Sequence, residues 1–146
     1  MFVRFKFLKL LSFLLILTFF PINKSFSGAN GNGELKLSSD LVYYFIQYIR
    51  GGQHKYPMVF YVTEDGTDGT YWYCPEMSNC REDSPSQSLQ ICLRQTGQEC
   101  KRFARKRTII WKNDINPGKG KMSKINSKWS DQEIIDKLVK LGFYSK

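Results

Sequence analysis

The sequence predicts an α+β domain: a small antiparallel sheet of about four strands, arranged as two hairpins, with helices packed on one face and disulfides stapling the whole. Three observations predict this class. Segments with helical apolar periodicity alternate with short aromatic or aliphatic runs, Gly-rich turns separate those runs, and four cysteines lie between residues 74 and 100. A chain of 146 residues has room for one domain, and 42% hydrophobic residues exclude wholesale disorder.

The first 27 residues are typical of an export signal. Basic residues precede an apolar run over residues 10–20, which is shorter than the roughly 20 residues that span a bilayer. Small residues at Ser25 and Ser27 suit cleavage after Ser27, and an uncleaved N-terminal anchor is the alternative. We therefore expect a secreted or periplasmic protein with a cleaved signal peptide (1–27) and no transmembrane span after cleavage.

The cysteines predict two disulfides, because an even number of cysteines in a small exported domain is read as a disulfide framework. Cys74 and Cys80 have five residues between them, and Cys92 and Cys100 have seven. Both gaps are wider than the two to four residues typical of zinc knuckles, so we expect neither a metal nor a cofactor. Three pairings are possible, and we favour neighbours with neighbours.

The domain proper is expected to begin at residue 38. Residues 28–37 are rich in Gly and Asn and predict a flexible lead, and residues 38–146 form the single domain. Ser39 or Asp40 offers a helix cap and Gly51 a stop, with a wide apolar face between them. This pattern predicts a helix, although the β-branched and aromatic residues within it leave a strand open.

Two hairpins and a helix follow in the middle of the chain. Residues 58–62 and 70–73 flank a Gly-rich turn and predict the first hairpin. Ser84 before Pro85 predicts the start of a helix that ends at Gly97. The second hairpin is expected to turn near Arg105 and Lys106, between residues 101–104 and 107–111.

The last helix has the clearest boundaries. A loop over residues 112–128 precedes it, and Ser130 with Glu133 makes a capping box at its start. Gly142 then stands where a helix ends in a Schellman motif. We expect a capped C-terminal helix over residues 130–141 that docks on the sheet.

One stretch of the chain carries a family resemblance. Ser88-Leu-x-x-Cys92 on a helix is followed by Cys100-x-x-Phe103-Ala104 and a second apolar strand. Residues 71–111 thus resemble small secreted bacterial domains of unknown function. The resemblance implies a Cys92–Cys100 link and supplies no catalytic residue. The basic turn and the additional pair, Cys74 and Cys80, depart from the pattern of those domains.

The most distinctive feature of the composition is a concentration of positive charge. Residues 101–128 hold ten bases and a single acid, Asp114, in a chain whose formal net charge is +9. We expect the hairpin and loop to bind anions of an envelope component or an acidic protein, through Lys101, Arg102, Arg105, Lys106, Arg107 and Lys112. No nucleic-acid-binding motif accompanies these bases. The alternative is that the lysines only keep a hairpin and a loop soluble.

Catalytic candidates are few. A single histidine in the chain excludes His-pair chemistry, and His54 with Glu64, Asp65 or Asp68 would be the components of a small secreted hydrolase. The same carboxylates fall short of the ligand number of a calcium loop. The sequence therefore favours an exported, non-catalytic binding or envelope-associated module, with that hydrolase as the alternative.

Aromatic residues are concentrated in the first hairpin. Side chains alternate between the two faces of a strand, so Tyr71 and Tyr73 share one face and Trp72 takes the other. We expect one set to pack in the core and the other to lie on an open face, where it could stack on a sugar or another ligand.

Overall fold

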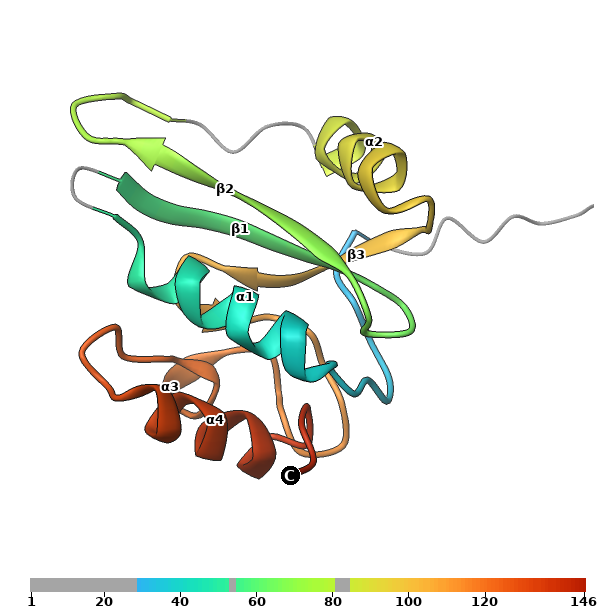
Figure 1. Cartoon of the computed structure of the whole chain (residues 1–146), viewed down its shortest axis with the longest axis vertical. Helices are drawn as coiled ribbons and strands as arrows, with labels where there is room; N and C mark the ends of the chain where they lie inside the picture. The colour runs from blue at the N-terminus through green and yellow to red at the C-terminus, as the bar shows by residue number, and fades with distance from the viewer. Residues whose placement is uncertain (1–28, 53–54, 81–84) are drawn as a thin grey trace, which may run out of the picture.

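The computed structural model describes residues 29–52, 55–80 and 85–146. Within these ranges the chain folds into four helices and a four-stranded antiparallel sheet, which confirms the α+β class (Figure 1). In chain order the elements are α1 (Ser39–Arg50), β1 (Lys55–Thr63), β2 (Gly69–Pro75), α2 (Pro85–Thr96), β3 (Cys100–Arg105), β4 (Thr108–Ile109), α3 (Gly120–Ser123) and α4 (Asp131–Lys140). The export signal expected over residues 1–27 lies outside the described residues.

The strands lie in the order β2-β1-β3-β4. β1 with β2 and β3 with β4 form the two expected hairpins, and α2 carries the chain across so that β3 pairs with the other side of β1. β4 is shorter than expected, because the backbone N–H groups of Ile110 and Trp111 both donate to the carbonyl of Phe103 and the regular ladder stops there. β2 and β4 are therefore the two edges of the sheet.

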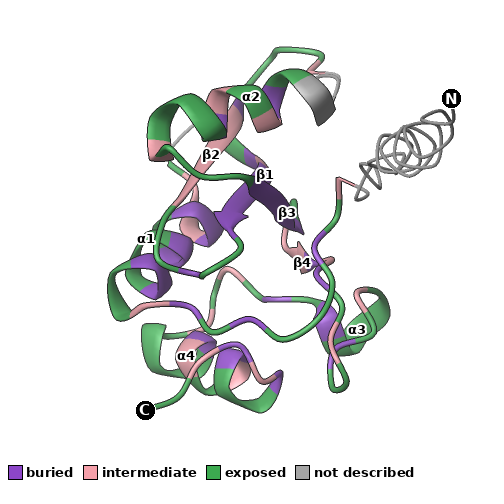
Figure 2. Ribbon diagram, turned by 90° about the vertical axis from the view of Figure 1, so that its right-hand side faces the viewer, coloured by how far each residue is buried: buried purple, intermediate pink, exposed green. Residues whose placement is uncertain are grey.

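Helices cover both faces of the sheet, which corrects the expectation of one covered face (Figure 2). Phe60, Val62 and Phe103 pack into a large core with α1 and α4, whereas Val59 and Tyr61 pack under α2. Successive residues of β1 point to opposite faces. The unbroken apolar run over residues 58–62 is the signal of a strand buried on both sides, a pattern that single-face coverage does not explain.

Aromatic rings fill the centre of the large core. The rings of Phe45 and Phe60 meet edge to face at 5.2 Å, and Phe103 contacts Phe143 at 5.1 Å in the same geometry. All four of these residues are fully buried. Edge-to-face pairs of this kind add roughly 0.5–1.5 kcal/mol beyond the area they bury. This core fixes α1 and the C-terminal segment on the same side of the sheet.

The segment expected to be a flexible lead is built into the domain from residue 29 onwards. Its Gly31 N–H donates to the carbonyl of Arg102, and its Leu35 and Leu37 are core residues. A Cβ on Gly31 would lie 1.8 Å from the indole ring of Trp111, so glycine serves close approach here. The prediction of flexibility over residues 28–37 is thus corrected for residues 29–37, which form a strap across the sheet.

The helix boundaries follow side-chain capping. Ser38 caps α1 by accepting from the Leu41 N–H at 3.2 Å, one residue earlier than expected. The predicted capping box is confirmed at α4, where the Ser130 N–H donates to Glu133 at 2.7 Å and the Glu133 N–H to Ser130 at 3.2 Å. Ser84, the cap expected before α2, lies outside the described residues.

Both disulfides join neighbouring cysteines, as predicted. Cys74–Cys80 closes the loop that leaves β2, and Cys92–Cys100 ties α2 to the start of β3. None of the described cysteines is free. The second bond is deeply buried beneath α2, so it belongs to the packing of that layer.

Candidate basic pocket

The six cations expected to bind anions do not converge on one surface. Lys101 and Arg102 are each only 9% exposed. Lys101 lies 3.9 Å from Glu64, and Arg102 donates to Asn30 at 3.3 Å. Both are held inside the domain and are not presented to a ligand.

The other four cations divide between two places. Arg105, Lys106 and Arg107 lie at or beside the tight turn between β3 and β4. Lys112 instead lies against the strap, where the Gly33 N–H donates to its carbonyl. Of the six, Arg107 lines a sizeable pocket.

That pocket, hereafter the basic pocket, has a volume of about 470 Å³. Three cations contribute to it, together with one aromatic ring and uncharged polar groups. Its lining consists of Arg107, Lys121, Lys124, Ile125, Asn126, Ser127 and Trp129. Among these described residues there is no Asp or Glu, so the pocket is lined by positive charge without an acidic counterpart.

Backbone pairing brings the distant segments of the pocket together. Thr108 forms an isolated antiparallel bridge with Lys124, and the Ile125 N–H donates to the Arg107 carbonyl at 2.8 Å. The Ile125 side chain is 1% exposed and belongs to the large core. Burying Ile125 therefore holds Lys124 beside Arg107, although sixteen residues separate them in the chain.

A buried polar pair positions α3, which lies where a plain loop was expected. Ser123 donates to Asn116 Oδ1 at 2.6 Å, and Asn116 Nδ2 donates to the Trp111 carbonyl at 2.7 Å. Both side chains are fully buried. Because buried polar groups are costly unless hydrogen-bonded, this pair fixes how α3 sits on the end of β4. Lys121 is carried on this short helix.

Arg107 is oriented by α1. Its Nε donates to the carbonyl of Ile49 at 3.2 Å, in the last turn of the helix, where carbonyls lack helical partners. Its two terminal nitrogens have no hydrogen-bond partner among the described residues, and neither do the ammonium groups of Lys121 and Lys124. The pocket thus holds three cations without an ion-pair partner among the described residues: Arg107 is oriented by its bond to α1, and Lys121 and Lys124 are exposed on a backbone held by α3 and the Ile125 pairing.

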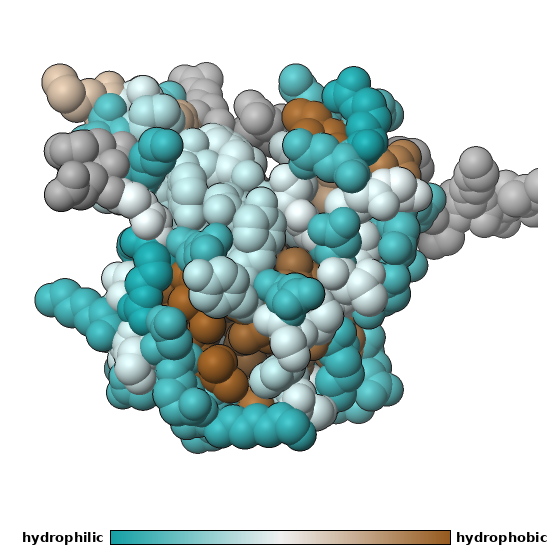
Figure 3. Space-filling view, in the orientation of Figure 1, coloured by the Kyte–Doolittle hydropathy of each residue, from teal (hydrophilic) through white to brown (hydrophobic). Residues whose placement is uncertain are grey.

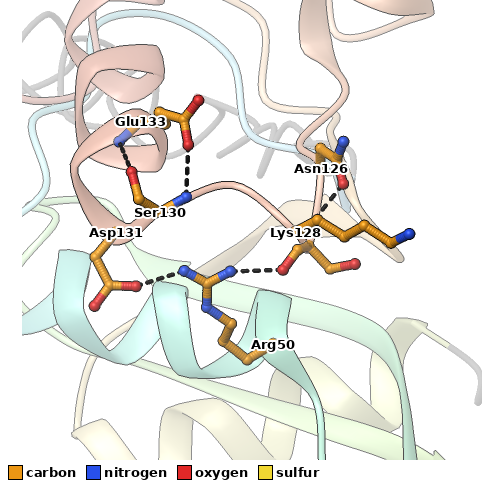
Figure 4. A network of polar contacts seen from close by, with 7 residues as sticks. Arg50, Asn126, Lys128, Ser130, Asp131 and Glu133 are labelled. Carbon is orange, nitrogen blue, oxygen red and sulfur yellow. Dashed lines mark hydrogen bonds and ion pairs between the residues drawn. The ribbon is translucent and has the colours of Figure 1, made fainter.

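Arg50 holds the loop that contributes Ser127 and Trp129 to the pocket (Figure 4). Its Nη1 donates to the Ser127 carbonyl at 2.5 Å, and its Nη2 contacts Asp131 at 2.6 Å. One guanidinium therefore connects the end of α1 to the loop before α4 and to the first turn of α4. Trp129 stands on that loop, half-buried against the large core. Its indole ring forms a flat apolar side of the pocket.

The basic stretch predicted a site, but the six residues named from it miss most of the pocket. Lys121 and Lys124 belong to the part of the stretch that the sequence predicts as a loop. Trp129 follows the stretch directly, and an aromatic residue at the end of a run of cations is the signal that could have indicated it. Asn126 and Ser127 carry no such signal.

The carboxylates of the hydrolase alternative serve the turn between β1 and β2. Asp65 Oδ1 accepts from the Thr63 hydroxyl at 2.6 Å and from the N–H and hydroxyl of Thr67. These bonds, that of Thr63 first, lower the pKa of Asp65 to about 2. Asp68 accepts from the Gly69 N–H at 2.7 Å. His54 lies outside the described residues, so the pairing of histidine with carboxylate is untested.

The aromatic residues of β2 pack on both faces of the sheet, and each of them is partly buried. Tyr71 and Tyr73 pack against the large core, and Trp72 packs under α2. The Tyr73 hydroxyl donates to the Gln47 carbonyl at 2.9 Å, and partial burial raises its pKa. The face expected to be open is partly covered, because α2 lies over Trp72.

The described residues contain neither a metal-binding cluster nor a membrane-spanning helix. No group of three His, Cys, Asp or Glu side chains there could hold a metal ion. No helix in the same part of the chain combines the length and hydrophobicity needed to cross a membrane. Comparisons of the chain with protein-family models, with curated proteins and with solved structures find no match.

Proposed function

We propose that this protein is an exported, non-catalytic binding module that captures an anionic ligand in the basic pocket. One observation carries the proposal: Arg107, beside the β3–β4 turn, lines one pocket with Lys121 and Lys124 of α3 and its C-cap, and no carboxylate is among the lining residues. Lysines that only keep a protein soluble need no fixed arrangement relative to one another. Here a buried isoleucine, a buried Asn–Ser pair and an arginine clamp position the walls between them.

The charge and shape of the pocket select the ligand class. Guanidinium and ammonium groups form their strongest hydrogen bonds with phosphate, sulfate or carboxylate oxygens. A volume of about 470 Å³ suits a small molecule or the end of a chain, and the face of Trp129 gives an apolar contact for its body. An anionic group of an envelope glycan or an acidic peptide has this chemistry.

The two disulfides support the proposal that the protein is exported. Two disulfides join four described cysteines, and such bonds persist in oxidising compartments outside the cytosol. Together with the leader pattern in residues 1–27, they favour a secreted or periplasmic location. The anions available there are envelope components, which agrees with a binding role for the pocket.

The test removes the three charges and keeps the size of the side chains. A triple variant Arg107→Gln, Lys121→Gln, Lys124→Gln is compared with the parent for binding to heparin, an acidic glycan probe. We expect about tenfold weaker binding at low ionic strength, and a gap that narrows as salt screens the charges. Isothermal titration calorimetry measures both affinities.

A matched control distinguishes the effect of the pocket on heparin binding from the effect of net charge. The triple variant Lys55→Gln, Arg94→Gln, Lys140→Gln loses the same three charges from exposed positions outside the basic pocket. At about 0.15 M salt, where the Debye length is about 8 Å, it is expected to bind heparin within about twofold of the parent, because distant exposed charges are then largely screened. Equal weakening by both triple variants would show that only overall charge matters, and the proposal would be abandoned.

A further inference from the structure

A second surface lies at the other end of the molecule, where β2 runs beneath α2 (Figure 1). Among the described residues, β2 pairs only with β1, so its outer edge is open. The opposite edge of the sheet, β4, is covered where Thr108 bridges to Lys124. The two edges therefore differ: within the described part of the chain, no strand or bridge pairs with the outer edge of β2.

The open edge carries few of the features that usually protect one, although the β1–β2 ladder has an irregularity between Pro57 and Val59 of β1. Natural edge strands carry charged residues, inner prolines or bulges that discourage pairing with another chain. β2 reads Gly-Thr-Tyr-Trp-Tyr-Cys-Pro, without a charged residue and with proline only at its end. The surface over β2 is pale in Figure 3, the colour of side chains of intermediate hydropathy. Such an edge can accept an added strand through main-chain hydrogen bonds.

A small pocket opens between this edge and α2. Tyr61, Thr70 and Trp72 line it from the sheet, with the neighbouring Tyr71, and Ser88 and Ile91 line it from the helix. Its volume is about 170 Å³, close to the roughly 150 Å³ cavity that accepts one benzene molecule in another protein. None of these described lining residues is charged. The pocket therefore has room for a single uncharged side chain.

Two buried polar atoms beside the pocket have no hydrogen-bond partner among the described residues. They are Tyr61 Oη and Trp72 Nε1. Leaving a buried donor unsatisfied costs about 1–3 kcal/mol. A bound peptide that supplies a main-chain carbonyl to these atoms would remove part of that cost.

We propose that β2 and α2 form a binding groove for an extended peptide segment of a partner protein, which adds to the edge of β2 and inserts one uncharged side chain into the pocket. The open edge selects an extended main chain. The pocket volume selects a single residue, and its lining selects a side chain that is aromatic or aliphatic. This inference is independent of the basic pocket, which lies beyond α1 beside α3 and α4.

The probe is a phage-displayed library of random dodecapeptides, selected against the protein as the expressing cell processes it, with both disulfides intact. We expect enriched peptides to share one uncharged apolar position between β-forming residues. A synthetic peptide of the enriched sequence is then titrated into ¹⁵N-labelled protein. The expected result is chemical-shift changes in the amides of β2 and α2, with those of α3 and α4 unchanged.

Two variants of α2 test the pocket itself. Ser88→Leu fills it, whereas Gln90→Leu adds a similar volume at an exposed position of the same helix. We expect Ser88→Leu to weaken peptide binding about tenfold and Gln90→Leu to change it less than about twofold. Thr70→Glu places a charge at the edge of β2 and should also weaken peptide binding. Its effect on packing differs from that of Ser88→Leu, so it is a second test of the site. Amide spectra report whether each variant keeps its fold.

Three outcomes would overturn the proposal: no enrichment of any peptide sequence, equal binding by Ser88→Leu and Gln90→Leu in folded proteins, or shift changes confined to the basic pocket. A fourth concerns a second copy of the chain. If dilution alone shifts the β2 amides and sedimentation shows a dimer, the edge pairs with its own copy and not with a partner peptide.

Discussion

Asp65 stabilises the β1–β2 turn in its charged form. Its hydrogen bonds to Thr63 and Thr67 lower its pKa to about 2 from the ordinary 3.8. A carboxyl group with a lowered pKa contributes stability above its unfolded pKa and loses it as the pH falls through the folded value. We predict that stability decreases between about pH 4 and pH 2, by less than about 1 kcal/mol from this group, because the carboxylate is exposed and screened.

Urea denaturation at several pH values across that window checks this prediction. Asp65→Asn should lower stability at neutral pH and make the curve flatter between pH 4 and pH 2. Asp114→Asn is the control, since Asp114 is exposed and no described residue bonds to its carboxylate. A pH dependence equally steep in Asp65→Asn and in the parent would contradict the assignment.

Gly31 is the residue of the strap whose substitution the structure tolerates least. An added Cβ would lie 1.8 Å from Trp111 Cε3, and the indole is fixed by a bond from its Nε1 to the Gly33 carbonyl at 3.0 Å. Overpacking of this kind costs about 1–3 kcal/mol. We predict that Gly31→Ala lowers the free energy of unfolding by that amount, measured by chemical denaturation. Gly52→Ala, where a Cβ meets nothing within 4 Å, should be near neutral.

At the scale of elements, Arg50 joins α1 to α4. Its guanidinium contacts the Ser127 carbonyl and the Asp131 carboxylate, so its loss releases both the loop that carries Trp129 and the first turn of α4. We predict that Arg50→Gln costs about 1–2 kcal/mol, more than an exposed ion pair, because the guanidinium is partly shielded and doubly bonded. Faster amide exchange at the start of α4 and weaker heparin binding are the expected readouts.

The matched control is another ion pair of the same helix. Lys146 contacts Asp136 at 2.6 Å, with both side chains more than half exposed. Lys146→Gln should change stability by less than about 0.5 kcal/mol and leave the start of α4 protected. If the two variants behave alike, Arg50 does not clamp the pocket wall.

Elements with strong local signals could be predicted from the sequence. The α4 capping box, the turn of the first hairpin and the pairing of neighbouring cysteines depend on residues close together in the chain, and each is confirmed. The coverage of both sheet faces was missed, since the apolar run in β1 shows that a strand is buried but not which helix lies on each side. The strap was missed because Gly and Asn suit close packing as well as flexibility.

Local sequence patterns do not reveal how the basic pocket is assembled. Charge density indicated residues 101–128, but burial decides which cations are available, and burial depends on long-range contacts. Lys101 and Arg102 lie in β3, a strand in the middle of the sheet, and so are enclosed. Lys124 reaches Arg107 through the pairing of Ile125 with the end of the hairpin. Neither outcome follows from the spacing of basic residues.

At the scale of the whole molecule, the two faces of the sheet have unequal support. The face toward α1 and α4 holds the large aromatic core, whereas the face toward α2 holds only a small cluster around Val59, Tyr61 and the Cys92–Cys100 bond. A helix with little apolar burial depends on its crosslink. Closing a loop of this length contributes about 2–3 kcal/mol in the chain-entropy model.

We therefore predict that the double variant Cys92→Ala, Cys100→Ala loosens α2 while the large core stays folded. Hydrogen exchange followed by mass spectrometry should show α2 amides exchanging far faster than in the parent, with α1 and α4 still protected. Cys74→Ala with Cys80→Ala is the control, because that bond closes a loop outside the α2 layer and should leave the exchange of α2 unchanged. Uniform loss of protection in the first variant would mean that both faces unfold as one cooperative unit. Selective loss would also be expected to abolish peptide binding at β2 and α2 and to spare heparin binding at the basic pocket, since the two sites depend on different layers.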